Sequence, residues 1–132
     1  MSQTTIAAAM LALAVVFGAF GVHGLRDILD PYSMTVYEKG VFYHFVHALG
    51  MLAIPLLIRA GLVSAGAGTW ASRMLLLGIV CFSGSLYALA LTGQTLWGAV
   101  APIGGTAFIV GWMMLAWAGM QDSKPTSPPS VP

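Results

Sequence analysis

Charged side chains are scarce in this sequence. Only 7% of its 132 residues are Asp, Glu, Lys or Arg, whereas soluble domains carry about a quarter. Hydrophobic residues make up 58% of the chain. This composition predicts a protein whose solvent is a lipid bilayer, and five basic against four acidic residues give no field that would attract nucleic acid.

Cysteine is almost absent, and so are the residue groupings that catalysis requires. The single Cys81 excludes an intrachain disulfide, a CxxC redox pair and a four-cysteine metal site. The sequence has no nucleophile beside a base, no paired catalytic carboxylates and no phosphate-binding glycine loop. We therefore expect neither an enzyme nor a bound cofactor.

Four apolar runs are long enough to cross a membrane, which takes roughly 20 mostly apolar residues as a helix. The predicted spans are 6–22, 40–58, 74–91 and 98–120. The first is expected to be a retained span, because the preceding MSQTT lacks the basic residues of a signal peptide. The prediction is an all-α, integral membrane four-helix bundle over residues 1–120, followed by a disordered Pro- and Ser-rich tail at 121–132.

Basic residues near the span ends predict the orientation. With four spans, Arg59, Arg73 and Lys124 lie on one side of the membrane, and Arg26 and Lys39 lie on the other. Both arginines of the second connection stand beside span ends. We therefore expect both termini in the cytoplasm and the charged first connection, residues 23–39, on the outside.

Small residues recur along single faces of the predicted helices. Because lipid tails are as apolar as leucine, membrane helices associate through close backbone approach at such residues. These stripes predict a compact bundle, with Cys81 as a small packing residue. The packing positions are Ala7, Ala14, Gly18 and Gly21 in the first span, Gly78, Cys81, Ser85 and Ala88 in the third, and Gly104, Ala107, Gly111 and Ala118 in the fourth.

Two prolines mark predicted helix starts. Asp30 followed by Pro31 is typical of an N-cap and first turn, and it predicts a short interfacial helix that enters the membrane near Gly40. Pro102 fits the first turn of the fourth span. The alternative for Pro102 is a helix broken around Gly104 and Gly105, as in transporter sites.

The histidines are the candidate site. His44 and His47 are three residues apart and share a helix face, and His23, with Arg26 and Glu38 near it, lies at the same membrane boundary. The structural interpretation is that neutral histidines hydrogen-bond to carbonyls, tyrosines or the loop, so that His23 and His47 pin the first connection onto the bundle. The alternatives are a proton or polar-ligand site, and a metal or haem ligated by His23, His44 and His47.

Four stretches carry a resemblance to a known family: FGAFGVHGL (17–25), YEKGVFYHFVHALG (37–50), FSGSLYALALTG (82–93) and APIGGTAFIVGW (101–112). They resemble the YgdD-like and transmembrane protein 256 family, a domain of unknown function. The resemblance implies four helices in a bacterial inner membrane or an organelle membrane, and no established reaction, substrate or cofactor. His23 and His47 match motif histidines, whereas His44 departs from the family pattern.

Three function classes remain open. A structural or accessory, membrane-stabilising protein of the bacterial inner membrane explains the small-residue stripes and the lack of charge inside the spans. A small oligomeric transporter is the first alternative, although the spans contain none of the carboxylates that proton-coupled exporters use. A histidine-ligated metal or haem protein is the second. The expected partners are membrane lipids, with a membrane-protein partner or a second copy as further candidates.

Overall fold

The computed structural model describes residues 2–122, and these form four long helical spans and no strand. The spans are Gln3–Leu25, Pro31–Arg59, Ala65–Thr92 and Thr95–Gln121, each long and apolar enough to cross a membrane. Each predicted range lies within one of them, so the prediction of an all-α, four-span bundle is confirmed. The predicted tail lies outside the described residues, except that the last helix continues to Asp122.

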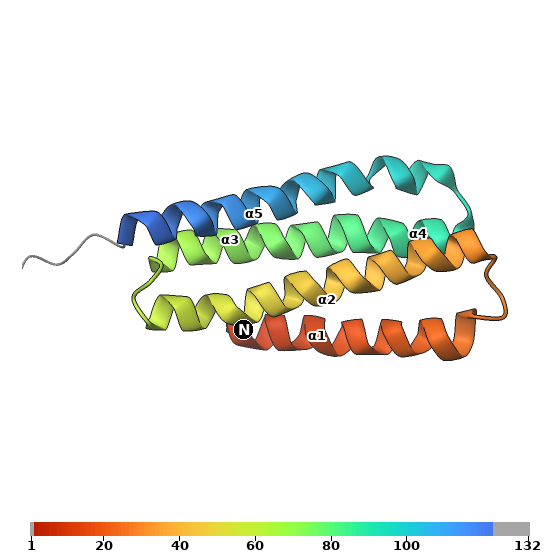
Figure 1. Ribbon diagram of the computed structural model, residues 1–132, viewed down its shortest axis with the longest axis horizontal. Helices are drawn as coiled ribbons and strands as arrows, with labels where there is room; N and C mark the ends of the chain where they lie inside the picture. The colour runs from red at the N-terminus through yellow and green to blue at the C-terminus, as the bar shows by residue number, and fades with distance from the viewer. Residues whose placement is uncertain (1, 123–132) are drawn as a thin grey trace, which may run out of the picture.

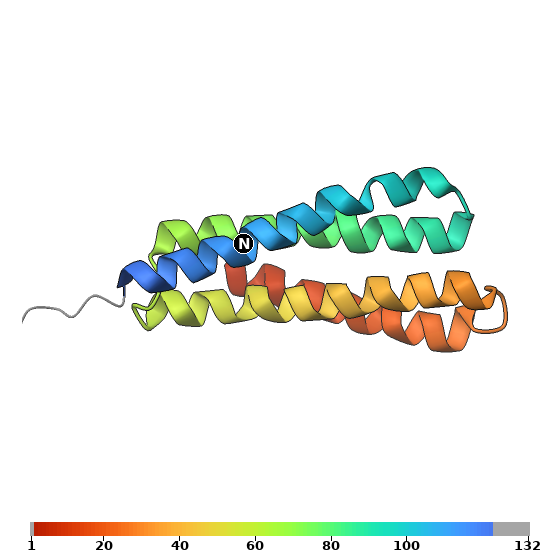
Figure 2. The same ribbon diagram turned by 45° about the horizontal axis from the view of Figure 1, so that its top comes forward.

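The spans are built from five α-helices and three short η segments. Successive spans run antiparallel, with α1 beside α2 and α5 beside α3 and η2 (Figures 1 and 2). Helix α2 is central, because it contacts α1, α3, α4 and η2. The segments are α1 (Gln3–Phe20), η1 (Gly21–Leu25), α2 (Pro31–Arg59), α3 (Ala65–Gly78), η2 (Ile79–Ser83), α4 (Gly84–Thr92), η3 (Thr95–Ala99) and α5 (Ala101–Asp122).

Helix α2 begins where the Asp-Pro pair predicts. The Asp30 side chain accepts hydrogen bonds from the backbone N–H groups of Tyr32 and Ser33 and from the Ser33 hydroxyl. The bonds from Ser33 lower the pKa of Asp30 below its usual value. The separate interfacial helix is wrong: α2 continues from Pro31 to Arg59 as one α-helix.

Helix α5 is also continuous, from Ala101 to Asp122. Pro102 is its second residue, where the missing backbone N–H costs no helical hydrogen bond. The alternative of a helix broken at Gly104 and Gly105 is therefore wrong. Gly104 serves close packing instead, since a Cβ there would collide with the backbone nitrogen of Phe82.

Two segments are π-helical, η1 in the first span and η2 in the third. A π-helical turn adds a residue to the helix and rotates the faces that follow. The stripe predicted for the third span is therefore only partly buried: Gly78 and Ser85 are buried, whereas Cys81 and Ala88 are intermediate.

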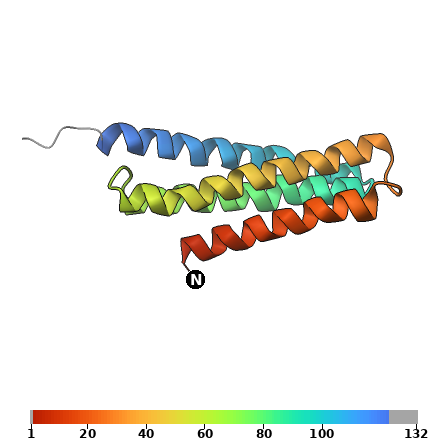
Figure 3. The same cartoon turned by 60° about the horizontal axis from the view of Figure 1, so that its bottom comes forward.

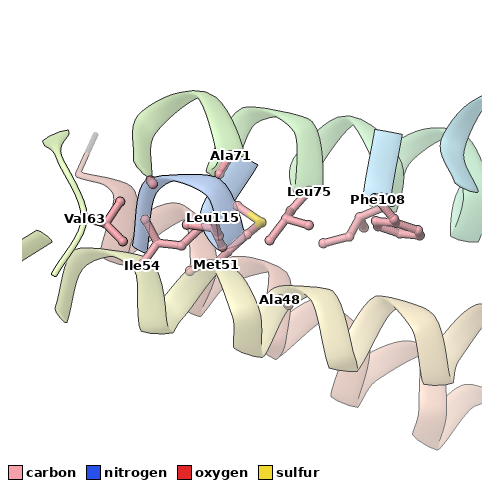
Figure 4. Packing of buried hydrophobic residues seen from close by; sticks show 11 residues of the cluster. Ala48, Met51, Ile54, Val63, Ala71, Leu75, Phe108 and Leu115 are labelled. Atoms are coloured by element: carbon pink, nitrogen blue, oxygen red, sulfur yellow. The ribbon is translucent and has the colours of Figure 1, made fainter. Parts of the chain in front are cut away.

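The main hydrophobic core lies at the end of the bundle where α2 joins α3 (Figure 4). Met51 and Ile54 of α2 meet Leu75 of α3 and Leu115 of α5 there, and all four are at least nine-tenths buried. Small residues allow this approach. Gly111 leaves room for Leu75, whose nearest side-chain atom would lie 3.0 Å from an added Cβ.

Candidate functional site

The histidines of α2 lie inside the bundle, each against a different neighbour. His44 is 3% exposed, and its Nδ1 lies 3.2 Å from the hydroxyl oxygen of Tyr87 on α4. The Tyr87 ring fits over Gly40, where an added Cβ would stand 2.9 Å from Cε1 of that ring. The absence of a side chain at Gly40 therefore lets Tyr87 approach His44.

His47 contacts α5. Its ring stacks on Phe108 with centroids 3.4 Å apart and planes inclined by 14°. Its Nδ1 lies 2.6 Å from the backbone carbonyl of Tyr43. Because a carbonyl only accepts hydrogen bonds, Nδ1 carries the proton and donates it. His47 therefore joins two helices and does not contact the first connection, so the hypothesis that it pins that connection is wrong.

Tyr37 ties the N-terminal part of α2 to the first span instead. Its hydroxyl donates a hydrogen bond of 2.8 Å to the backbone carbonyl of Phe17, and the residue is 1% exposed. Gly21 makes room for the ring, since an added Cβ would lie 2.8 Å from Cε1 of Tyr37. Phe17 in turn stacks on Tyr87 at 4.7 Å. This aromatic cluster holds the first span against α2 and α4.

The remaining candidate residues do not converge with the α2 histidines. His23, Arg26 and Glu38 are all exposed, His23 in η1 and Glu38 on α2. Within residues 2–122, no group of three His, Cys, Asp or Glu side chains is placed to hold a metal ion. His44 and His47 therefore lie inside the bundle, where each contacts a different helix. The charged candidates, Arg26 and Glu38, are exposed.

Two buried polar atoms stay unpaired among the described residues: Nε2 of His44 and Oγ of Ser83. Ser83 is fully buried in η2, and η2 packs against α2. The His44 ring also interacts with the backbone of Met10 on α1, although that contact does not meet the geometry of a hydrogen bond. Unpaired polar atoms at membrane depth are unusual, so His44 is the most distinctive polar group of the interior.

Sequence reasoning did not single out Ser83 or Tyr87 as site residues. A signal existed for Tyr87, because it is a polar ring inside an apolar run, and a buried tyrosine hydroxyl requires a partner. No comparable signal existed for Ser83. Ser83 is the last residue of the π-helical segment η2, and the sequence pattern does not disclose where a π-helical turn falls.

These features define a class: a small four-span membrane protein whose interior is filled by aromatic rings, glycine contacts and two histidines. The model of a family described as "Protein of unknown function (DUF423)" matches residues 17–105. This chain belongs to that family, and the predicted resemblance to it is confirmed.

The similar proteins are bacterial and are named as membrane proteins. A UPF0382 membrane protein of Staphylococcus epidermidis is 47% identical over 109 residues, which covers 83% of this chain and 87% of the relative. The UPF0382 membrane protein YwdK of Bacillus subtilis is 42% identical over 109 residues, covering 83% and 88%. A relative in Haemophilus influenzae is 35% identical over 112 residues, covering 83% and 86%. No solved structure matches the chain.

Proposed function

We propose that this chain is a structural or accessory, membrane-stabilising protein without catalytic activity. One observation carries the proposal: both buried histidines, His44 and His47, are used in contacts between helices. His44 contacts Tyr87 of α4, and His47 stacks on Phe108 of α5. A polar group that holds helices together contributes to stability and is not free to act on a substrate.

The proposal includes location and partners. We place the chain in the bacterial inner membrane with both termini in the cytoplasm, because the second connection is flanked by Arg59 and Arg73. The bacterial sources of the similar membrane proteins support this placement. The partners are membrane lipids and a second membrane protein, or another copy of this chain.

The test is isolation at native abundance in a mild detergent, followed by native electrophoresis and mass spectrometry. An accessory role predicts a complex of fixed stoichiometry with a membrane protein, and proteoliposomes of the purified chain that carry no proton or solute flux. A chain that migrates without a stoichiometric partner and supports flux in proteoliposomes would overturn the proposal.

A proton or polar-ligand site at His44 is the second candidate, favoured by the burial of an ionisable ring inside the spans. Proteoliposomes loaded with a pH-sensitive dye test it directly. A proton flux that is present in the wild type and lost in His44→Gln, but kept in His23→Gln at the exposed rim, would favour this candidate over the accessory role.

A further inference from the structure

At the end of the bundle where α2 joins α3, the first span stops short of the ends of the other helices. It has 23 residues, against 29 in the α2 span, which makes it about 9 Å shorter at 1.5 Å per residue. Figures 1 and 3 show the N-terminus well inside the ends of α2, α3 and α5. The side-chain amide of Gln3 donates a hydrogen bond of 2.7 Å to Thr69 Oγ1, and this bond fixes the start of α1 beside α3. Thr69 lies a full turn inside α3.

A cavity occupies the space that α1 leaves open, and we call it the N-terminal notch. Its volume is about 640 Å³, within the range of small-molecule sites. Ser2, Gln3, Thr69 and Arg59 supply its polar side, and Pro55 and Leu56 are part of its apolar wall. The notch thus joins hydrogen-bond donors and a cation to an apolar surface, at the boundary of the membrane.

The Arg59 side chain does not cap the end of its own helix. Arg59 is the last residue of α2, where an arginine often caps the final carbonyls. Here backbone groups do so: Leu62 N–H donates to the Leu57 carbonyl and Gly61 N–H to that of Ile58, with Gly61 at φ +71°. Arg59 is exposed and makes no hydrogen bond or ion pair with any side chain that the structure describes.

A second arginine stands beside the notch. A neighbouring hollow of about 270 Å³ shares Gln3 and Thr69 with it and is lined by Arg73. The guanidinium of Arg73 lies 5.0 Å from the ring centroid of Trp70, one turn nearer the membrane surface. Long basic side chains extend in this way toward lipid headgroups, with tryptophan at the same level. Two cations therefore face the headgroup layer around the polar start of α1.

We propose that the N-terminal notch binds the headgroup of an anionic phospholipid, with its phosphate on Arg59 and the start of an acyl chain along Pro55 and Leu56. The charge of the guanidinium matches a phosphate, which forms strong charge-assisted hydrogen bonds. The hydroxyls of Ser2 and Thr4 offer further donors, and both residues are exposed in the notch. A lipid uses the polar and the apolar sides of the notch together, whereas a free phosphate uses only the first.

The test is native mass spectrometry of the full chain released from a neutral detergent, with phosphatidylglycerol or phosphatidylcholine of identical acyl chains. We expect one phosphatidylglycerol retained in preference to phosphatidylcholine, and about tenfold weaker retention in Arg59→Gln, which loses a hydrogen bond to a charged group. The matched control is Arg26→Gln, which removes an exposed arginine at the opposite end of the bundle and leaves retention unchanged.

A second variant tests the shape of the notch without altering its charge. Ala65 is an exposed residue of the lining in the first turn of α3, and Ala65→Trp fills part of the notch. Ala65→Trp is expected to reduce retention of phosphatidylglycerol although Arg59 is intact. Because two unrelated variants probe the same notch, a folding defect in one of them does not decide the test.

Two results would overturn the proposal. Equal losses in Arg26→Gln and Arg59→Gln would show attraction by net charge alone. Displacement of the lipid by millimolar inorganic phosphate, in both the wild type and Ala65→Trp, would assign the site to free phosphate.

Discussion

At the residue scale, buried tyrosine hydroxyls and histidine rings make specific contacts between helices. Tyr37 is the clearest case, because its ring lies in a space opened by Gly21 and its hydroxyl reaches the Phe17 carbonyl. The carbonyl also accepts a hydrogen bond from the Gly21 N–H within its own helix. Loss of the tyrosine hydroxyl therefore leaves no buried acceptor unpaired, and its cost is that of one ordinary hydrogen bond.

We predict that Tyr37→Phe lowers the free energy of unfolding by about 1 kcal/mol, the net worth of one intramolecular hydrogen bond. The matched control is Tyr32→Phe, at a tyrosine that is 72% exposed. Chemical or thermal unfolding of both variants in one detergent measures the difference. Equal stability of the two variants would mean that the hydroxyl of Tyr37 contributes nothing.

The candidate site was predictable only in part at this scale. Helical spacing places His44 and His47 on one face of α2. Both are buried, as expected if that face packs against other helices. Their partners were beyond the sequence, because a contact with Tyr87 or Phe108 depends on how distant helices align. The exposed position of His23 follows from its place at the end of the first span.

At the element scale, glycine decides how closely α5 approaches the third span. Gly104 and Gly105 are adjacent on α5 but face different surroundings. A Cβ on Gly104 would strike the backbone of Phe82, which cannot rotate away, whereas a Cβ on Gly105 would lie 3.8 Å from the nearest atom of the Phe82 ring. The two positions therefore form a matched pair with the same intrinsic helix propensity.

We predict that Gly104→Ala destabilises the bundle by about 1–3 kcal/mol, as overpacking does when helices are forced apart. Gly105→Ala is expected to be neutral or stabilising, since alanine favours the helix and its methyl group makes an ordinary contact. Thermal unfolding of both variants in the same detergent measures this contrast. Similar melting temperatures would contradict close packing at Gly104.

Helix positions were predictable from the sequence, but helix faces were predictable only as far as the helices stay regular. The small residues of the fourth span keep their spacing through α5, and Gly104, Ala107, Gly111 and Ala118 are all buried. The third span loses register at η2, so Cys81 turns partly away from the interior. A spacing rule of 3.6 residues per turn contains no information about where a π-helical turn falls.

At the scale of the whole molecule, the number of spans follows from composition because a bilayer admits few alternatives. Each spanning segment must satisfy its own backbone hydrogen bonds, and a long apolar run does so as a helix. The charged residues then collect at the two ends of the bundle. What composition leaves open is the relative level of the spans, and the short first span creates the N-terminal notch.

The same charges predict the orientation of the bundle, with both termini in the cytoplasm. In a Cys81→Ala background, single cysteines at Asp27, exposed in the first connection, and at Gly66, near the second connection, report the two faces. Gly66 tolerates the change, because an added Cβ there meets no atom within 4 Å. With Arg59 and Arg73 held inside the cell, a membrane-impermeant maleimide should label the cysteine at position 27 in intact spheroplasts. The cysteine at position 66 should react only after the membrane is permeabilised, and the reverse pattern would place both termini outside.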